Sequence, residues 1–187
     1  MSNNITIALI AGTSRAGRES IKAARYVAEF GQNLPDVTIV FVDPTDFHLA
    51  GDGNDPEAKD PAYTAITQKA DAFFIVTPEY NHSFPGSLKR LLDSEYANYI
   101  HKPVALAGVS NGAWGGVRAV EALVTSVREM GLVATSYSVY FPRVQDLFTA
   151  DGQLKAAHVG QYSRSVGYAY NELLWLARAL KSARKEK

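Results

Sequence analysis

Three polar segments of this 187-residue chain carry residue types that bind phosphate groups and flat aromatic ligands. The first spans residues 12 to 20 and carries hydroxyl groups and two guanidinium groups, which donate hydrogen bonds to a phosphate dianion. It lies between an apolar run and a helical pattern, so backbone N–H groups and the helix dipole face the same ligand. An ordinary strand-to-helix turn with solvated arginines is the alternative. The predicted phosphate donors are Thr13, Ser14, Arg15, Arg18 and Ser20.

This first segment differs from the two common nucleotide-binding sequences. No Gly-Lys-Ser/Thr follows it, as a triphosphate-binding P-loop requires, and it lacks the three glycines of the dinucleotide fingerprint. Triphosphate hydrolysis is therefore disfavoured.

The second segment, residues 77 to 86, combines two prolines with two aromatic residues. Prolines make such a loop stiff and prevent a helix at its start, so it can present a flat surface to a planar ring. Asn81 would then form hydrogen bonds to the edge of the ring, while Tyr80 or His82 lines the pocket. Alternatively, this is a rigid turn whose aromatic residues belong to the core or to a subunit interface. The predicted ring-binding residues are Pro78, Glu79, Tyr80, Asn81 and His82.

The third segment, residues 110 to 116, contains three glycines, which allow the backbone to approach a ligand closely. Its main-chain donors would face the carbonyl groups of a ring. Alternatively, it is a glycine-rich turn in which Trp114 packs over the start of the following helix. The predicted ligand-binding residues here are Ser110, Asn111, Gly112, Gly115 and Gly116.

Five short apolar runs, with helical patterns between most of them, predict the elements that position these segments. Because the runs are apolar on both sides, they are typical of buried parallel strands. Five strands and about five helices in under 200 residues predict an α/β, doubly wound sheet. In a sheet of order 2-1-3-4-5, the three segments meet at one edge, where ligands bind. The predicted strands are Ile5 to Ile10, Val37 to Val42, Ala72 to Thr77, Val104 to Val109 and Leu132 to Tyr140.

Helical spacing predicts one helix over Val117 to Met130 and a closing helix from about Tyr162 to Leu180. The basic tail from Lys181 to Lys187 is expected to be a frayed, solvated end. The segment from Asp43 to about Lys59 has no clear period and predicts a loop that could cover the site. The expectation is one domain over residues 1–187.

Composition narrows the function classes. The 19 basic residues balance the 19 acidic ones, so bulk charge does not draw the chain to nucleic acid or to an anionic membrane. The chain has no cysteine, hence no disulfide and no thiolate nucleophile, and any redox chemistry must come from a bound cofactor. No metal site is predicted, because no paired histidine accompanies His82. The run Ile5 to Ile10 is too short to span a bilayer, and a cytoplasmic location is expected.

The three segments together resemble the NADPH-dependent FMN reductase family. Its members share a Gly-Ser-x-Arg phosphate loop, a Pro-Glu-Tyr-Asn segment and a glycine-rich loop before the fourth helix. The stretch Thr77 to Leu92 carries the most specific part of the match. Thr13 stands where the family usually has serine, which preserves the hydroxyl, and the end of the loop, residues 18 to 20, varies within the family.

The resemblance implies a flavodoxin-like three-layer sandwich that binds FMN. Residues 13, 14, 15, 18 and 20 would hold the FMN phosphate, and Pro78 to His82 with Ser110 to Gly116 would hold the isoalloxazine ring. NADPH, or NADH, would donate electrons that pass to a small acceptor such as a quinone, a free flavin, an azo compound or an oxidised metal ion. Hydride transfer needs no acid or base side chain, so no catalytic residue is assigned.

Two other function classes share this type of sheet. A flavodoxin-type electron carrier binds FMN without reacting with nicotinamide and docks on partners through complementary charge, which the zero net charge disfavours. A receiver-like regulatory module needs acidic residues for Mg²⁺ after the first strand, where this chain reads Gly-Thr-Ser-Arg.

The segment after the third predicted strand is more apolar and aromatic than one sheet contact requires, which favours a homodimer or homotetramer. The alternative is that most of these side chains are core. The residues concerned are Tyr80, Phe84, Leu88, Leu91, Leu92, Tyr96 and Tyr99.

Overall fold

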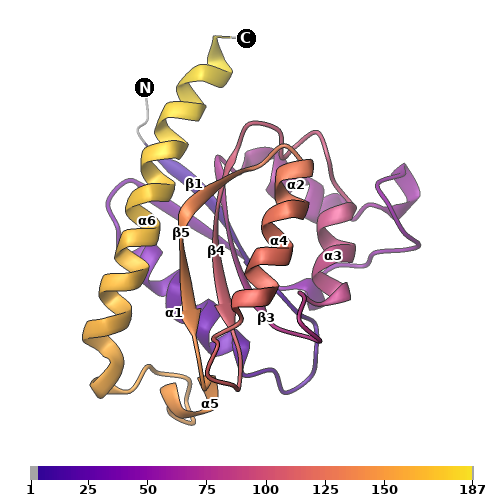
Figure 1. Ribbon diagram of the computed structural model, residues 1–187. Coiled ribbons are helices and arrows are strands. Elements are labelled where there is room, and N and C mark those ends of the chain that lie inside the picture. Colours follow the sequence, from indigo (N-terminus) through magenta and orange to yellow (C-terminus); the bar gives the residue numbers. More distant parts are fainter. Residues whose placement is uncertain (1–3, 187) are drawn as a thin grey trace.

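The computed structural model describes residues 4–186 and contains a five-stranded, all-parallel sheet in the order β2-β1-β3-β4-β5 (Figure 1). The observed ends differ from the predicted ends by one residue at most. Each prediction of a strand and the predicted order are therefore confirmed. The strands are β1 (Ile5–Ala11), β2 (Val37–Val42), β3 (Ala72–Pro78), β4 (Pro103–Val109) and β5 (Val133–Phe141).

Helices cover both faces of the sheet and form the three layers seen in Figure 1. One face packs against α1 (Ser20–Gln32) and α6 (Ala156–Lys185), and the other against α2 (Pro61–Lys69), α3 (Gly86–Asp93) and α4 (Val117–Glu129). A short helix, α5 (Val144–Leu147), follows β5.

The central strands are buried on both faces, as their uninterrupted apolar runs predict. Every residue of β4 is buried, and alternate residues enter different cores. Phe74 faces the core under α1 and α6, and its neighbour Phe73 faces the core under the other three helices. Successive side chains of a strand point to opposite faces, so one run of apolar residues supplies both cores.

The prediction of a frayed, solvated C-terminal end is wrong for residues 181–185, which are helical, and Lys187 lies outside the described residues. Helix α6 continues to Lys185, and two of its basic residues bind the start of β3. Lys181 donates to the Asp71 carboxylate at 2.7 Å, while Arg184 donates to the His101 carbonyl at 2.6 Å and lies 3.8 Å from Asp71. The basic residues thus extend the helix past the sheet because a carboxylate and a carbonyl meet them there.

Lys102, just before β4, is buried beside this cluster. Its ammonium group donates to the carbonyls of Thr67 and Gln68 at 2.7 and 3.4 Å, near the end of α2. Burial, and to a smaller extent the charge of Arg184, lowers the pKa of Lys102 to about 8.

We expect the stability of the protein to rise with pH above about 8 because of Lys102. The folded chain loses this proton at about pH 8, whereas the unfolded chain keeps it until about pH 10. The penalty for burying the charge is therefore fully present below the folded pKa and disappears as the pH rises through this window. Urea unfolding of the native chain and of Lys102→Met checks this. The native chain should gain stability relative to the variant between these pH values, and parallel pH profiles would contradict the assignment.

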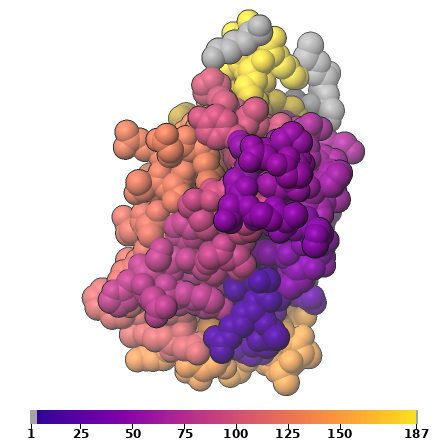
Figure 2. Space-filling view, turned by 90° about the vertical axis from the view of Figure 1, so that its right-hand side faces the viewer, coloured from indigo at the N-terminus to yellow at the C-terminus, as the bar shows by residue number. Residues whose placement is uncertain are grey.

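The segment after β2 does not cover the site, contrary to expectation. It contains two short 3₁₀ helices, Pro44–Asp46 and Pro56–Ala58, and runs along the α3 side of the molecule, on the surface that faces the viewer in Figure 2. Arg90 of α3 fixes it by donating to the carbonyls of Ala50, Gly53 and Ala58 at 2.7, 3.3 and 2.8 Å.

Most of the apolar residues in and after α3 belong to the core. Leu88, Leu91, Leu92 and Tyr99 are fully buried, whereas Tyr96 is 48% exposed. The alternative that these side chains belong to the core is thus confirmed for these four residues. Tyr96 keeps an exposed surface that a subunit interface could cover. Over residues 4–186, no helix is both long and apolar enough to cross a bilayer.

Candidate functional site

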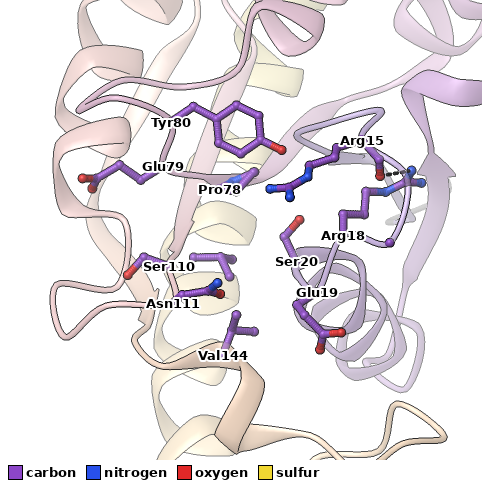
Figure 3. Close-up of a pocket in the computed structure, with 12 residues that line it drawn as sticks. Arg15, Arg18, Glu19, Ser20, Pro78, Glu79, Tyr80, Ser110, Asn111 and Val144 are labelled. Atoms are coloured by element: carbon purple, nitrogen blue, oxygen red, sulfur yellow. Dashed lines mark hydrogen bonds between the residues drawn. The ribbon is translucent and has the colours of Figure 1, made fainter.

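A cleft of about 270 Å³ opens at the carboxyl ends of the strands (Figure 3). It is slightly smaller than a typical pocket of about 300–1,000 Å³, so part of a drug-sized ligand would stay exposed. The three segments singled out in the sequence meet here, as predicted. The lining residues are Arg15, Gly17, Arg18, Glu19, Ser20, Pro78, Glu79, Tyr80, Val109, Ser110, Asn111 and Val144.

One wall of the cleft is the N-terminal end of α1. Helix α1 begins at Ser20, and its N-cap residue Glu19 makes no side-chain hydrogen bond to the first turn. The N–H groups of Ser20 and Ile21 have no hydrogen-bond partner among residues 4–186. Free N–H groups and the positive end of the helix dipole suit an anion.

Arg15 adds a free charge to this wall. Its guanidinium group points into the cleft, near Pro78 and Tyr80 (Figure 3), and forms no ion pair or hydrogen bond with any residue of the described chain. The Ser20 hydroxyl faces the same space. Together these groups form a donor set for a phosphate dianion.

Arg18, the other predicted arginine, is turned away from the centre of the cleft (Figure 3). Its guanidinium group forms an ion pair with Asp43, which follows β2, and also donates to the Arg15 carbonyl at 3.3 Å. The Nε–H of Arg18 is buried and has no partner in the described chain.

Close packing joins the first two loops. A Cβ atom on Gly12 would lie 2.6 Å from the Thr77 Cα atom, so only glycine allows this approach. Thr13 is buried, and its hydroxyl lies 3.2 Å from the Tyr80 hydroxyl. Ser14 donates its N–H to the Ser87 hydroxyl at 3.3 Å. Neither Thr13 nor Ser14 lines the cleft: Thr13 holds the first loop against the second, and Ser14 holds it against the start of α3.

The second loop reverses direction directly after Tyr80. Tyr80 and Ser83 exchange backbone hydrogen bonds of 2.8 and 3.0 Å around a two-residue turn. Asn81 and His82 have φ angles of 50° and 66°, the left-handed conformation that such a turn requires. Both side chains are exposed and do not line the cleft.

The third loop contributes Ser110 and Asn111 to the cleft, while two of its three glycines serve packing. Gly116 has a φ angle of 85°, and a Cβ atom there would lie 2.5 Å from the Val109 nitrogen. Gly115 also has positive φ and packs against Tyr140 of β5, whereas a Cβ atom on Gly112 would meet nothing within 4 Å. Gly115 and Gly116 therefore let the loop approach the neighbouring strands closely.

Arg118 of α4 forms an ion pair with Glu79 and fixes its side chain. This ion pair was not predicted from the sequence. The Glu79 carboxylate is 8% exposed and accepts from Arg118 Nε at 2.7 Å. The Arg118 guanidinium also lies 6.0 Å from the centre of the Trp114 ring, which is 68% exposed. Glu79 Oε2 is buried without a partner in the described chain.

Four further residues line the cleft and were not predicted from the sequence: Gly17, Glu19, Val109 and Val144. Val144 reaches the cleft because its N–H donates to the Ser110 carbonyl at 3.1 Å. The place of Val144 just after the fifth strand is the signal that could have predicted it, because every strand end at this edge lies near the site. Within residues 4–186, no cluster of three or more histidine or acidic residues could hold a metal ion.

The fold and the cleft define a class of protein: a doubly wound α/β domain with a cleft at the strand ends, a helix end without a side-chain cap on one side and a stiff aromatic loop on the other. A family model, NADPH-dependent FMN reductase, matches residues 5–146, which contain all three loops. The chain belongs to this family. It is an oxidoreductase that uses FMN as cofactor and NAD(P)H as electron donor, rather than a flavodoxin-type carrier or a receiver-like module.

Individual relatives agree with this assignment. An NADPH azoreductase of Bacillus sp. strain OY1-2 is 31% identical over 153 residues, which are 79% of this chain and 81% of the relative. A quinone reductase of Pseudomonas putida is 28% identical over 163 residues, with 82% and 87% covered. Among solved structures, the flavoenzyme NAD(P)H:(acceptor) oxidoreductase FerB of Paracoccus denitrificans superposes with a TM-score of 0.73 at 22% identity, covering 92% of this chain and 97% of FerB. The likeness to FerB concerns the fold alone.

Proposed function

We propose that the cleft holds FMN with its phosphate at the N-terminus of α1 and its ring between the second and third loops. The observation that carries this proposal is the free guanidinium group of Arg15 beside a helix end that no side chain caps. The guanidinium group and the helix end can bind one anion at the same place. The unpartnered Nε–H of Arg18 is a further buried donor on that side.

The remaining predicted residues support the ring or the loops around it. Pro78 and Tyr80 line the ring side, and Ser110 and Asn111 form the opposite wall. The N–H groups of Glu79, Tyr80 and Ser110 already pair with backbone carbonyls, whereas the Asn111 N–H has no partner among residues 4–186. Asn111 is therefore the residue of this wall that offers a backbone donor to the ring.

FMN, when bound, accepts hydride from a reduced nicotinamide and passes electrons to a second substrate. This chain's part is to bind the cofactor, to orient its ring and to leave one face open. The small cleft supports that arrangement, because a ring lying in it would remain partly exposed. The donor and the acceptor would then use the open face in turn.

We propose a quinone or an azo compound as the acceptor class, by similarity to the quinone reductase and the azoreductase described above. Both are flat, conjugated molecules that fit against an exposed flavin face. The same likeness to an NADPH azoreductase favours NADPH over NADH as donor.

A steady-state assay of the FMN-loaded protein with NADPH and a benzoquinone tests the acceptor. We expect parallel double-reciprocal plots, because the two substrates bind one face in turn and never together. Intersecting plots would mean that donor and acceptor bind simultaneously, at separate places.

We further propose that residues 1–187 act as one FMN-binding unit in the cytoplasm and assemble as a homodimer or homotetramer. Tyr96 supports assembly, since it is 48% exposed and lines a mainly apolar groove of about 400 Å³ between α3 and α4.

A further inference from the structure

A carboxylate from outside the cleft holds the phosphate-side loop. Asp43 forms an ion pair with Arg18, and the two side chains are only 15% and 14% exposed. Asp43 is itself held by Thr45, whose N–H and hydroxyl donate to Oδ1 at 3.0 and 2.8 Å. Arg18 in turn donates to the backbone carbonyl of Arg15. A continuous series of contacts therefore joins the loop after β2 to the backbone of the residue whose side chain enters the cleft.

We propose that Asp43 is a positioning residue for the phosphate site, which it shapes through Arg18. The inference rests on the proposed function, because it concerns how the FMN phosphate is held. Arg18 is one of the donors predicted from the sequence, and Asp43 fixes where its guanidinium group lies. With Arg18 held there, the loop of residues 12–20 keeps the Arg15 side chain and the free N–H groups of α1 directed at one point.

The sign of the effect separates this role from simple electrostatics. A carboxylate close to a phosphate dianion repels it, so removing the charge of Asp43 should tighten FMN binding if charge alone mattered. If Asp43 acts by positioning, removing its charge changes FMN affinity in the opposite direction. Without the carboxylate, Arg18 loses its ion-pair partner and the loop loses the contact that fixes it, so the phosphate binds less tightly.

The test compares FMN with riboflavin, which lacks the phosphate, in the full-length protein. Dissociation constants are measured by quenching of flavin fluorescence for the native chain, for Asp43→Asn and for Asp46→Asn. We expect Asp43→Asn to weaken FMN binding about tenfold, the effect of one charge-assisted contact, and to leave riboflavin binding unchanged. Asp46→Asn is the matched control. It removes the same charge from the end of the Pro44–Asp46 3₁₀ helix, whose N-cap is Asp43, but Asp46 is exposed and its side chain forms no hydrogen bond or ion pair within residues 4–186.

A double-mutant cycle then tests whether Asp43 acts through Arg18. Arg18→Ala should weaken FMN binding by a similar factor, and adding Asp43→Asn to it should cause little further loss. Additive losses, or FMN binding in Asp43→Asn that is unchanged or tighter, would overturn the inference. If Asp43→Asn does not fold, Thr45→Ala must show a smaller loss in the same direction. A native chain that binds neither flavin would instead overturn the proposed function.

Discussion

Replacing Arg15 by alanine is expected to weaken FMN binding by about 100-fold, the largest effect that we predict for one side chain in the cleft. The guanidinium group can donate two charge-assisted hydrogen bonds to the phosphate, and no residue of the described chain competes for it. Riboflavin binding should change by less than about threefold, because its ring contacts lie elsewhere. Isothermal titration calorimetry with both flavins measures the two constants.

Arg25→Ala provides the control for the loss of a positive charge. Arg25 is an exposed arginine on α1, the helix that follows the loop of Arg15, without a partner in the described chain, and it does not line the cleft. Its replacement should leave both constants unchanged. Equal losses for FMN and riboflavin in Arg15→Ala would contradict the placement of the phosphate at Arg15.

Gly116→Ala is expected to lower the free energy of unfolding by about 3 kcal/mol. The new methyl group would lie 2.5 Å from the Val109 nitrogen, and the φ angle of 85° is unfavourable for alanine. Because backbone and not a flexible side chain stands in the way, relief requires the third loop to move away from β4. Urea unfolding measures the loss of stability.

Gly112→Ala is the matched control in the same loop. A methyl group at Gly112 meets nothing within 4 Å, and its φ lies outside the left-handed region. Its replacement should change the free energy of unfolding by less than about 0.5 kcal/mol. Similar losses in the two variants would show that Gly116 has no special packing role.

The fold could be predicted from the sequence because local pattern and tertiary position agree. The runs at Ala72 and Val104 are apolar on both sides, and only a strand covered on both faces accommodates that pattern. The C-terminal end was predicted wrongly because its order depends on Asp71, more than 100 residues earlier in the chain. A run of basic residues does not by itself indicate whether a carboxylate from a distant part of the chain will form an ion pair with it.

The site could be predicted at the level of loops but not of individual contacts. Arg15 and Ser20 face the cleft as expected, since both lie where a strand meets a helix. Arg18 is turned toward Asp43, and Thr13 toward Tyr80, because partners from other loops were free to bind them. Such contacts depend on which strand ends are neighbours in space, and sequence spacing does not contain that information.

The most direct test of the central claim is an anaerobic visible spectrum of the FMN-loaded protein before and after addition of NADPH. We expect a bound-flavin band that bleaches when NADPH is added and returns when a quinone follows. A bound flavin that stays oxidised in the presence of NADPH, or a protein that takes up no flavin at all, would contradict it.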